Sequence, residues 1–319
     1  MSNIDPGPRL EQATQPSSVL PYGSELTSAT VAETRRGKFV RSLTSTGMLH
    51  LLLTGMSLLM VLPFTWMVLT SLKPAGEVND PDWFPSSFQW RNYLDVGDKD
   101  NPDPQRRGVD FGRFYWNSLF VAAWVTFLQV TTSAMAAFSF SRLQWPGRDK
   151  IFLMYLSTMM LPGLVMMIPN FQIMINLGWV NTFTGLIIPG AFSAFGTFLL
   201  RQFMLTIPSS IDEAAEIDGA SKFRLFWDII LPLARPGLIT LTIFTFMGNY
   251  NSFFWPLVML RSEHKYTLPI GLMFFDSTRG QSTHLLMAAV TMSVIPMIIL
   301  FVFLQKYLVR GIQLGAVKG

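Results

Sequence analysis

The stretch IDEAAEIDGASKFRLFWDIILPL, from Ile211 to Leu233, decides how this chain is understood. It carries acidic, basic and small residues, yet a long apolar run lies on each side of it. Those runs belong to a chain of 319 residues, of which 50% are hydrophobic and only 14% are charged. Soluble domains usually contain about a quarter charged residues. The stretch is therefore a polar segment between segments whose composition suits a membrane.

The charged residues leave gaps that are long enough for membrane-crossing helices. No Asp, Glu, Lys, Arg or His occurs between Arg113 and Arg142, between Lys150 and Arg201, or between Arg235 and Arg261. A helix needs about 20 apolar residues to cross the hydrocarbon core of a bilayer. Each gap holds one or two such helices, so the sequence predicts an all-α integral membrane protein. We expect six spans, over residues 48–72, 115–141, 151–173, 183–205, 236–260 and 285–307.

Local signals add detail to these spans. The sequence NLGWVNT, residues 176–182, supplies Gly and Asn for a turn between the third and fourth spans. Prolines inside the spans suit a helical bundle, where neighbouring helices satisfy the carbonyl groups that proline leaves free. Residues 1–34 are polar and lack the apolar core of a secretory signal. We expect a disordered tail or a short surface helix there, an N-terminal region over 1–41, and a membrane domain over 42–319.

Basic residues indicate the orientation of the chain. Several of them, in residues 35–41, precede the first span, which predicts a cytoplasmic amino terminus. Alternation of the spans then makes residues 142–150, residues 201–235 and the carboxyl terminus cytoplasmic as well. The 73–113 loop falls outside the cell and is rich in acidic residues. Both termini are therefore expected in the cytoplasm.

The residue content argues against several functions. A net charge of +4 that is not gathered into a basic patch with aromatic residues does not suggest nucleic-acid binding. The chain has no cysteine, and its three histidines lack the spacing of metal ligands, so no metal site is expected. A GxxxxGK[ST] phosphate loop is missing from the sequence, and no acid pair or Ser/His/Asp set occurs at membrane depth. The span interiors also lack the ionisable residues that ion-coupled carriers generally need. We therefore expect a non-catalytic pore or permease that is powered by another chain.

The first half of the opening stretch is typical of a short surface helix. Ser209 or Ser210 can cap this helix after Pro208. Acidic residues at 212–213 lie in its first turn, where they suit the helix dipole. The alanines at 214–215 give it a small face that another surface can approach closely.

The second half begins at Asp218-Gly219, where glycine permits a tight turn. A second, amphipathic helix is expected to follow. The whole segment 208–235 thus has the form of a helix pair that fits a groove in a partner. An ordinary interfacial loop explains the amphipathic pattern but not the small acidic helix followed by glycine. The apolar side of the second helix is expected to contain Phe223, Phe226, Trp227 and Ile230.

This segment resembles the EAA loop of binding-protein-dependent ABC permeases. The match consists of Glu-Ala-Ala, three residues, Gly, nine residues and then Ile-x-Leu-Pro, over residues 213–232. The fuller form, EAAxxDGA followed by LPLxxP, looks like the carbohydrate branch and is maltose-permease-like. The resemblance implies a type I ABC importer permease fold in which this helix couples the chain to an ATPase. The residues that it assigns to coupling are Glu213, Ala214, Ala215, Asp218, Gly219, Ala220, Phe226 and Pro232.

Three further segments resemble the same branch: residues 83–96, residues 265–272 and residues 306–319. The second of them, KYTLPIGL, looks like the periplasmic loop before the last span. It gives Tyr266, Leu268 and Gly271 as the expected contacts of a binding protein. One departure concerns the fifth span, where the family often has Trp-Asn-Asp/Glu-Phe and this chain has Tyr-Asn-Ser-Phe at 250–253. This departure bears on the substrate.

The polar residues Asn249, Tyr250 and Asn251 are expected to line the substrate path. A polar cluster is costly to expose to lipid, so it should point into the bundle or a water-filled path. Asn side chains both donate and accept hydrogen bonds, as sugar hydroxyls require. The same amides could instead bond only to a neighbouring helix.

The resemblance also implies the surroundings of the chain. It implies a bacterial inner membrane, a second permease subunit in a heterodimer, an ABC ATPase dimer that binds ATP and Mg, and an extracytoplasmic solute-binding protein. The chain itself is expected to carry no cofactor. The expected cargo is a sugar or oligosaccharide; the alternatives are a glycerol phosphodiester, a phosphorylated polyol, or no cargo at all in a membrane receptor or scaffold.

Overall fold

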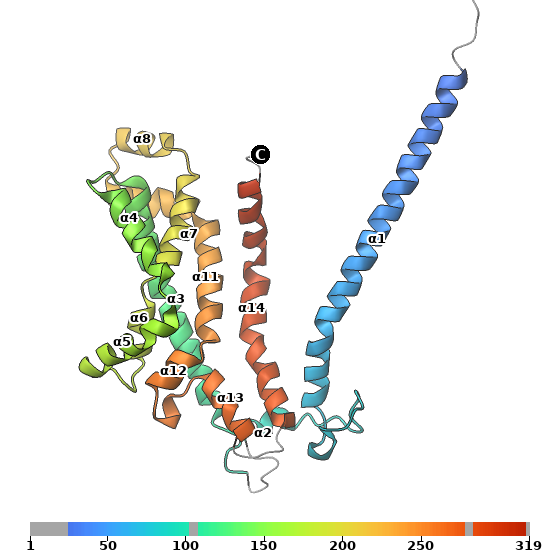
Figure 1. Cartoon of the computed structure of the whole chain (residues 1–319), viewed down its shortest axis with the longest axis vertical. Coiled ribbons are helices and arrows are strands. Elements are labelled where there is room, and N and C mark those ends of the chain that lie inside the picture. Colours follow the sequence, from blue (N-terminus) through green and yellow to red (C-terminus); the bar gives the residue numbers. More distant parts are fainter. Residues whose placement is uncertain (1–24, 102–107, 278–282, 317–319) are drawn as a thin grey trace, which may run out of the picture. The chain divides into compact units, whose positions relative to one another are not determined.

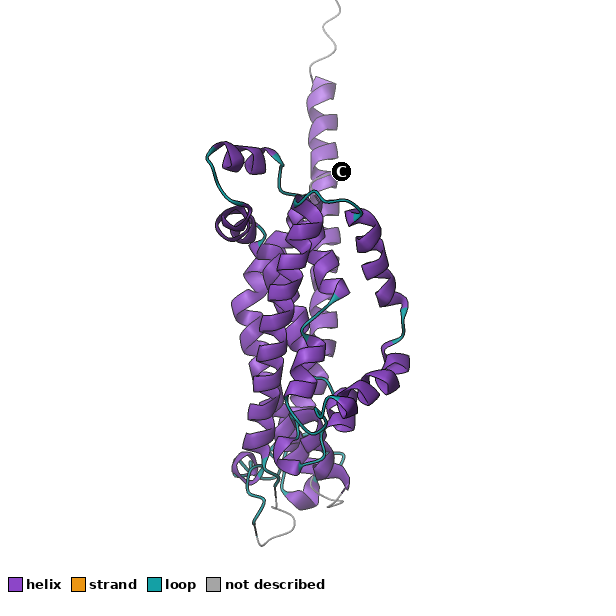
Figure 2. Cartoon of the chain, turned by 90° about the vertical axis from the view of Figure 1, so that its left-hand side faces the viewer, coloured by secondary structure: helices purple, strands orange, loops and turns teal. Residues whose placement is uncertain are grey.

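The computed structural model describes residues 25–101, 108–277 and 283–316, and every regular element in these ranges is helical (Figures 1 and 2). The chain divides into two compact units, residues 1–63 and 64–319. Helix α1 (Glu25–Ser71) makes up the described part of the first unit and continues into the second. Its residues 25–34 were expected to be disordered or to form a short surface helix. No proline occurs in residues 25–46, so the helix of the apolar span extends back over them without interruption.

The second unit contains the other helices, several of them short. Helices α3, α7, α11 and α14 run lengthwise through this unit, and α4, α5 and α6 lie along one side of it (Figure 1). Helix α8 crosses one end, and α2, α12 and α13 lie toward the other. The elements are η1 (Ala75–Glu77), α2 (Asn92–Asp95), α3 (Phe111–Arg142), α4 (Arg148–Ser157), η2 (Thr158–Met160), α5 (Gly163–Asn176), α6 (Thr184–Gly190), α7 (Ala194–Leu205), α8 (Ser210–Ile217), α9 (Lys222–Arg224), η3 (Leu225–Ile230), α10 (Leu231–Leu233), α11 (Arg235–Tyr250), α12 (Phe254–Met259), η4 (Glu263–Lys265), α13 (Leu268–Ser277) and α14 (Thr283–Ala316).

The described residues contain four helices that are long and apolar enough to cross a membrane, or up to six spans if each of two bent helix pairs counts as one. The all-α membrane fold predicted from the sequence is therefore confirmed. The four unbroken candidates are Gly47–Ser71, Phe111–Arg142, Thr184–Leu205 and Thr283–Lys306.

The third predicted span is bent rather than straight. Helices α4 and η2 meet α5 at an angle of 99° around Leu161 and Pro162. Leu161 has an extended backbone, with ψ at 121°, because a following proline disfavours the helical conformation. Pro162 is therefore not tolerated inside a continuous helix, as the bundle expectation allowed, but ends one.

The fifth predicted span, residues 236–260, is also shorter than expected. Helix α11 ends at Tyr250, and α12 is a separate short helix that contains Pro256. At its other end, α11 meets the preceding helical segment Lys222–Leu233 at an angle of 75°. The polar residues at 249–251 thus lie at the end of a helix, not within a span.

Helix α3 is the central element of the second unit, and it packs against α7, α11 and α13. Its close approach to α7 depends on Gly196, because a Cβ there would lie 2.6 Å from the hydroxyl of Ser133. Helix α14 packs on α11 and α13. Each end of this bundle has its own hydrophobic cluster, one around Phe114 and Leu285 and one around Leu200 and Phe226.

The predicted turn after the third span is confirmed. Gly178 has a φ of +69°, and the N–H of Trp179 bonds to the carbonyl of Met174, which closes the end of α5. Asn181 then ties the turn to the loop after α12, because its side-chain oxygen accepts the N–H groups of Arg261 and Ser262.

Candidate functional site

The segment singled out by the sequence lies at one end of the second unit. Figure 1 shows α8 across that end, beside α4 and α7, whereas α2, α12 and α13 lie at the other end. The helix is short, from Ser210 to Ile217, and it connects α7 to the helical segment that leads into α11. It is therefore the element through which an external force could reach both of these helices.

The start of α8 differs from the expected cap. Ser209 occupies the cap position, but its side chain makes no capping bond. Its backbone is already helical, at φ −66° and ψ −23°, whereas a capping hydroxyl needs an extended backbone. Backbone carbonyls of Pro208 and Ser209 accept the first N–H groups instead. The prediction of a serine side-chain cap is therefore wrong.

An ion pair fixes α8 to the bundle. Arg142 Nη1, at the end of α3, lies 2.8 Å from Asp212 Oδ2 in the first turn of α8. The other terminal nitrogen of Arg142 donates to the carbonyls of Met204, at 2.5 Å, and Ile207, at 2.8 Å. The last carbonyls of a helix lack partners within it, so this guanidinium also satisfies the end of α7. Arg142 thus joins α3, α7 and α8.

Sequence reasoning missed this role of Arg142 and treated it only as a basic flank of a span. The two partners are far apart in the sequence, and a single sequence does not show which distant residues form a pair. The only available signal was an arginine at the end of an apolar helix together with an aspartate in the first turn of a polar one. That signal is too weak to assign the pair.

The two faces of α8 differ sharply. Ala215 is buried in a cluster with Leu200 and Phe226. Glu213, Ala214 and Ile217 are exposed, and Ile217 is 86% exposed. The carboxylate of Glu213 has no partner among the residues that the structure describes. Helix α8 therefore presents an acidic and apolar face with a small central side chain.

Gly219 closes α8 with a turn that needs glycine. Its φ is +77°, a conformation that other residues adopt at a cost. Its N–H bonds to the carbonyl of Glu216, and the N–H of Ala220 bonds to that of Ala215, which is the Schellman arrangement. A Cβ at Gly219 would meet no atom within 4 Å, so the requirement comes from the backbone and not from space. The predicted Asp218-Gly219 turn is confirmed.

The second helix of the pair is helical but not amphipathic in the expected way. Phe226 and Ile230 are buried together with Leu225, while Phe223 and Trp227 are exposed. Residues 225–230 form a π-helical turn, which widens the helix and changes the face on which each residue lies. The ring of Phe226 packs 5.1 Å from that of Phe138 on α3. Pro232 is exposed in α10, before the bend into α11.

Arg201 provides a second fixed point near this end of the molecule. Its Nε donates to the carbonyl of Phe140, and its guanidinium lies 4.3 Å from the centre of the Phe152 ring. It therefore connects α7 with α3 and α4. No pattern in the sequence indicates this contact.

The polar residues at the end of α11 have unlike surroundings. Tyr250 is buried, stacks on Phe246 at 5.7 Å, and donates its hydroxyl to the carbonyl of Ser293 on α14. The amides of Asn249 and Asn251 bond to carbonyls one turn earlier in their own helix. Asn251 is exposed, so it is the member of this group that a passing ligand could contact directly.

The loop before α13 holds the residues expected to contact a binding protein. Asn117 of α3 donates to the carbonyls of His264 and Tyr266, which fixes this loop on the bundle. Leu268 is buried, and Gly271 lies against the ring of Phe114. Of the three expected contacts, only Tyr266 is partly exposed. Leu268 and Gly271 therefore serve the packing of the subunit itself.

The chain is similar to a large group of known proteins. Residues 129–314 match the family described as "Binding-protein-dependent transport system inner membrane component". The chain is 32% identical over 268 residues to the arabinooligosaccharides transport system permease protein AraQ of Bacillus subtilis, covering 83% of this chain and 92% of that protein. It is 33% identical over 235 residues to the sn-glycerol-3-phosphate transport system permease protein UgpE of Yersinia pestis, covering 72% and 81%.

A solved structure has the same architecture. The crystal structure of a bacterial ABC transporter involved in the import of the acidic polysaccharide alginate contains a chain that aligns with a TM-score of 0.72. The sequence identity is 26%, and the alignment covers 84% of this chain and 98% of that one. The bent helix pairs described above thus belong to a fold that occurs in a transporter.

Proposed function

The chain belongs to the binding-protein-dependent inner-membrane permeases of ABC importers, and we propose that it carries a sugar or oligosaccharide into the cytoplasm. It is a multi-pass membrane subunit without catalysis of its own. The family implies an ATPase and a binding protein as partners. We further propose a second permease subunit in a heterodimer, an ATPase dimer that holds ATP and Mg, and an extracytoplasmic position for the binding protein.

The two faces of α8 support the part of the proposal that concerns coupling to the ATPase. Ala215 and the Arg142–Asp212 pair hold the helix on the bundle, and Glu213, Ala214 and Ile217 are left free for a partner. Movement of α8 would pass to α3 through Arg142 and to α11 through the helical segment Lys222–Leu233. The helix is thus proposed to be the coupling helix, seated in a cleft of the ATPase. We propose that α8 and both termini lie in the cytoplasm.

The chemistry in and beside α11 supports a neutral cargo. Asn251, the exposed residue at the end of α11, has an amide that suits hydroxyl groups. No charged residue stands between Arg235 and Arg261 to bind a phosphate. The arabinooligosaccharide relatives agree with a saccharide. The glycerol-3-phosphate relatives support the alternative, a glycerol phosphodiester or phosphorylated polyol, whose charge the second permease subunit would then have to match.

The coupling proposal is tested with Glu213→Lys. Reversing this exposed charge should leave the subunit inserted but lower both co-purification of the ATPase and uptake into reconstituted vesicles. Asp228→Lys is the control, because Asp228 is also exposed but lies outside α8. Normal coupled uptake in the Glu213→Lys protein would place the docking surface elsewhere.

The cargo is tested by stimulation of ATP hydrolysis in the reconstituted transporter with its binding protein. Arabino-oligosaccharides should stimulate hydrolysis, and sn-glycerol-3-phosphate should not. The opposite result would favour the phosphorylated cargo and leave the coupling proposal intact.

A further inference from the structure

The segment after α1 buries two polar side chains and exposes five large apolar ones. Asn92 and Asp95 of α2 are 7% and 4% exposed, whereas Trp90 and Leu94 are 68% and 77% exposed. Trp90 lies in the turn that leads into α2, and Leu94 lies within α2. The exposed large apolar residues of the segment, here called the apolar loop surface, are Trp83, Phe84, Phe88, Trp90 and Leu94.

Hydrogen bonds fix this segment to the end of α1. The N–H of Gln89 donates to the carbonyl of Leu72 at 2.8 Å. The amide of Asn92 donates to the carbonyls of Ser71, at 2.8 Å, and Lys73, at 3.0 Å. These are carbonyl groups that the helix end leaves without partners. Trp90 is therefore held at the level where the apolar span Gly47–Ser71 ends.

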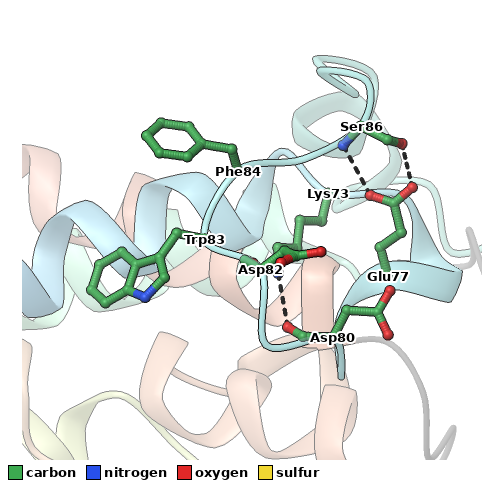
Figure 3. Close-up of a pocket in the computed structure, with 7 residues that line it drawn as sticks. All are labelled: Lys73, Glu77, Asp80, Asp82, Trp83, Phe84 and Ser86. Atoms are coloured by element: carbon green, nitrogen blue, oxygen red, sulfur yellow. Dashed lines mark hydrogen bonds between the residues drawn. The ribbon is translucent and has the colours of Figure 1, made fainter.

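The polar groups of the same loop gather on another side. The ammonium of buried Lys73 donates to the carbonyls of Asp80 and Asp82, and the hydroxyl and N–H of Ser86 donate to the carboxylate of Glu77. These residues, together with Trp83 and Phe84, line a cavity of about 420 Å³. Figure 3 shows the rings of Trp83 and Phe84 pointing away from Glu77 and Ser86. The two rings thus extend from this cavity in a different direction from the polar pair.

We propose that the apolar loop surface lies in the interfacial region of the bilayer, at the end of the subunit opposite α8, and anchors the end of α1. Tryptophan favours the membrane–water interface because its ring is apolar and its N–H is polar. The surface also continues directly from a membrane span. A soluble binding protein that docks and leaves would expose five large apolar side chains to water in every cycle, whereas the bilayer covers them permanently.

The chain has no cysteine, so single cysteines can be placed on each side of the loop. Leu94→Cys tests the apolar loop surface, and Asn79→Cys is the control on an exposed polar position of the same loop. Each full-length protein carries a nitroxide label in vesicles of phosphatidylethanolamine and phosphatidylglycerol, without binding protein. Collisions with oxygen, which concentrates in the membrane, are compared with collisions with a water-soluble nickel chelate.

The oxygen-to-nickel collision ratio should be severalfold higher at position 94 than at position 79. A water-like ratio at position 94 overturns the proposal. Protection that then appears only on addition of the binding protein would make the surface a protein docking site. If the Leu94→Cys protein fails to insert, the same collision ratio is measured at Phe84→Cys, where a high ratio supports the proposal and a water-like ratio overturns it. The outcome does not depend on which substrate the transporter carries or on how the ATPase docks.

Discussion

The guanidinium of Arg142 and the carboxylate of Asp212 meet at 2.8 Å although the two residues lie 70 positions apart in the sequence. Their side chains are only 6% and 18% exposed. The same guanidinium holds the last carbonyls of α7, so one side chain connects two long helices with the helix that is proposed to bind the ATPase. Displacement of α8 should therefore move α3 and α7 together.

Arg142→Gln is expected to weaken both stability and coupling. It leaves the carboxylate of Asp212 half-buried without its cation, which should lower the free energy of unfolding by about 2 kcal/mol. Uptake per assembled transporter should fall severalfold, while ATP hydrolysis becomes less dependent on substrate. Uptake and hydrolysis in reconstituted vesicles measure both effects.

A second substitution separates charge from packing in this pair. Arg142→Gln combined with Asp212→Asn removes the unpaired charge and should recover part of the stability. Arg224→Gln is the matched control, because its pair with Asp228 is exposed and such pairs contribute about 0–1 kcal/mol. Equal losses in the Arg142 and Arg224 variants would contradict a special role for Arg142.

Gly219→Ala is expected to impair coupling through the backbone alone. Its φ of +77° should cost alanine about 1 kcal/mol, with no added clash. Gly219→Asn should be milder, because asparagine tolerates this conformation, and Gly219→Pro should be more severe, because it also removes the N–H bond to Glu216. Gly76→Ala, at an open position without positive φ, controls for the methyl group. Uptake in the order Gly, Asn, Ala, Pro supports the turn; a different order does not.

Two substitutions at the end of α11 distinguish a structural role of Tyr250 from a substrate-binding role of Asn251. Tyr250→Phe removes the bond to Ser293 and should cost about 1 kcal/mol of stability without changing the substrate concentration for half-maximal uptake. Asn251→Leu should raise that concentration and leave assembly unchanged, since Asn251 is exposed. If both variants lose assembly at unchanged concentration dependence, the cluster is structural and the cargo path lies on the partner permease.

The proposed orientation is tested with cysteines at two exposed serines, Ser87 and Ser221. In intact cells, Ser87→Cys should react with a membrane-impermeant thiol reagent, because its loop is expected outside. Ser221→Cys, beside α8, should react only after the membrane is opened. The reverse pattern would invert the topology and place α8 away from any cytoplasmic ATPase.

The loop after α1 should lose order in acid. The hydroxyl and N–H of Ser86 lower the pKa of Glu77, with a further contribution from Lys73. A lowered folded-state pKa stabilises the loop fully above the ordinary value of 4.5 and loses this effect as pH falls through the folded value. Ser86→Ala should move the pKa of Glu77 back toward the ordinary value. Carboxyl NMR of labelled glutamate, assigned with Glu77→Gln, measures the shift; an unchanged pKa in Ser86→Ala would mean that these bonds do not form.

The sequence alone determined the class of the fold and singled out the segment that is proposed to couple the chain to an ATPase. Charge-free runs predict spans because the bilayer penalises every charge inside it, and this physical rule acts on the sequence directly. The turn at Gly219 could be predicted for a similar reason, since the need for a positive φ is local to one residue. The match to the EAA loop also depends only on residue types and their spacing.

Tertiary structure decided which partners meet and which faces are buried. The pairing of Arg142 with Asp212 depends on how α3 and α8 are placed, and no local pattern encodes that. The faces of the second helix were predicted wrongly because a π-helical turn changes the residue spacing, and packing against Phe138 selects Phe226. The sequence shows that Pro162 lies in an apolar run, but it does not show whether the helix bends there. Neighbouring helices decide this, because they either satisfy the backbone groups that proline leaves free or do not. Local rules fix what a segment can be, whereas contacts between distant segments fix where each side chain points.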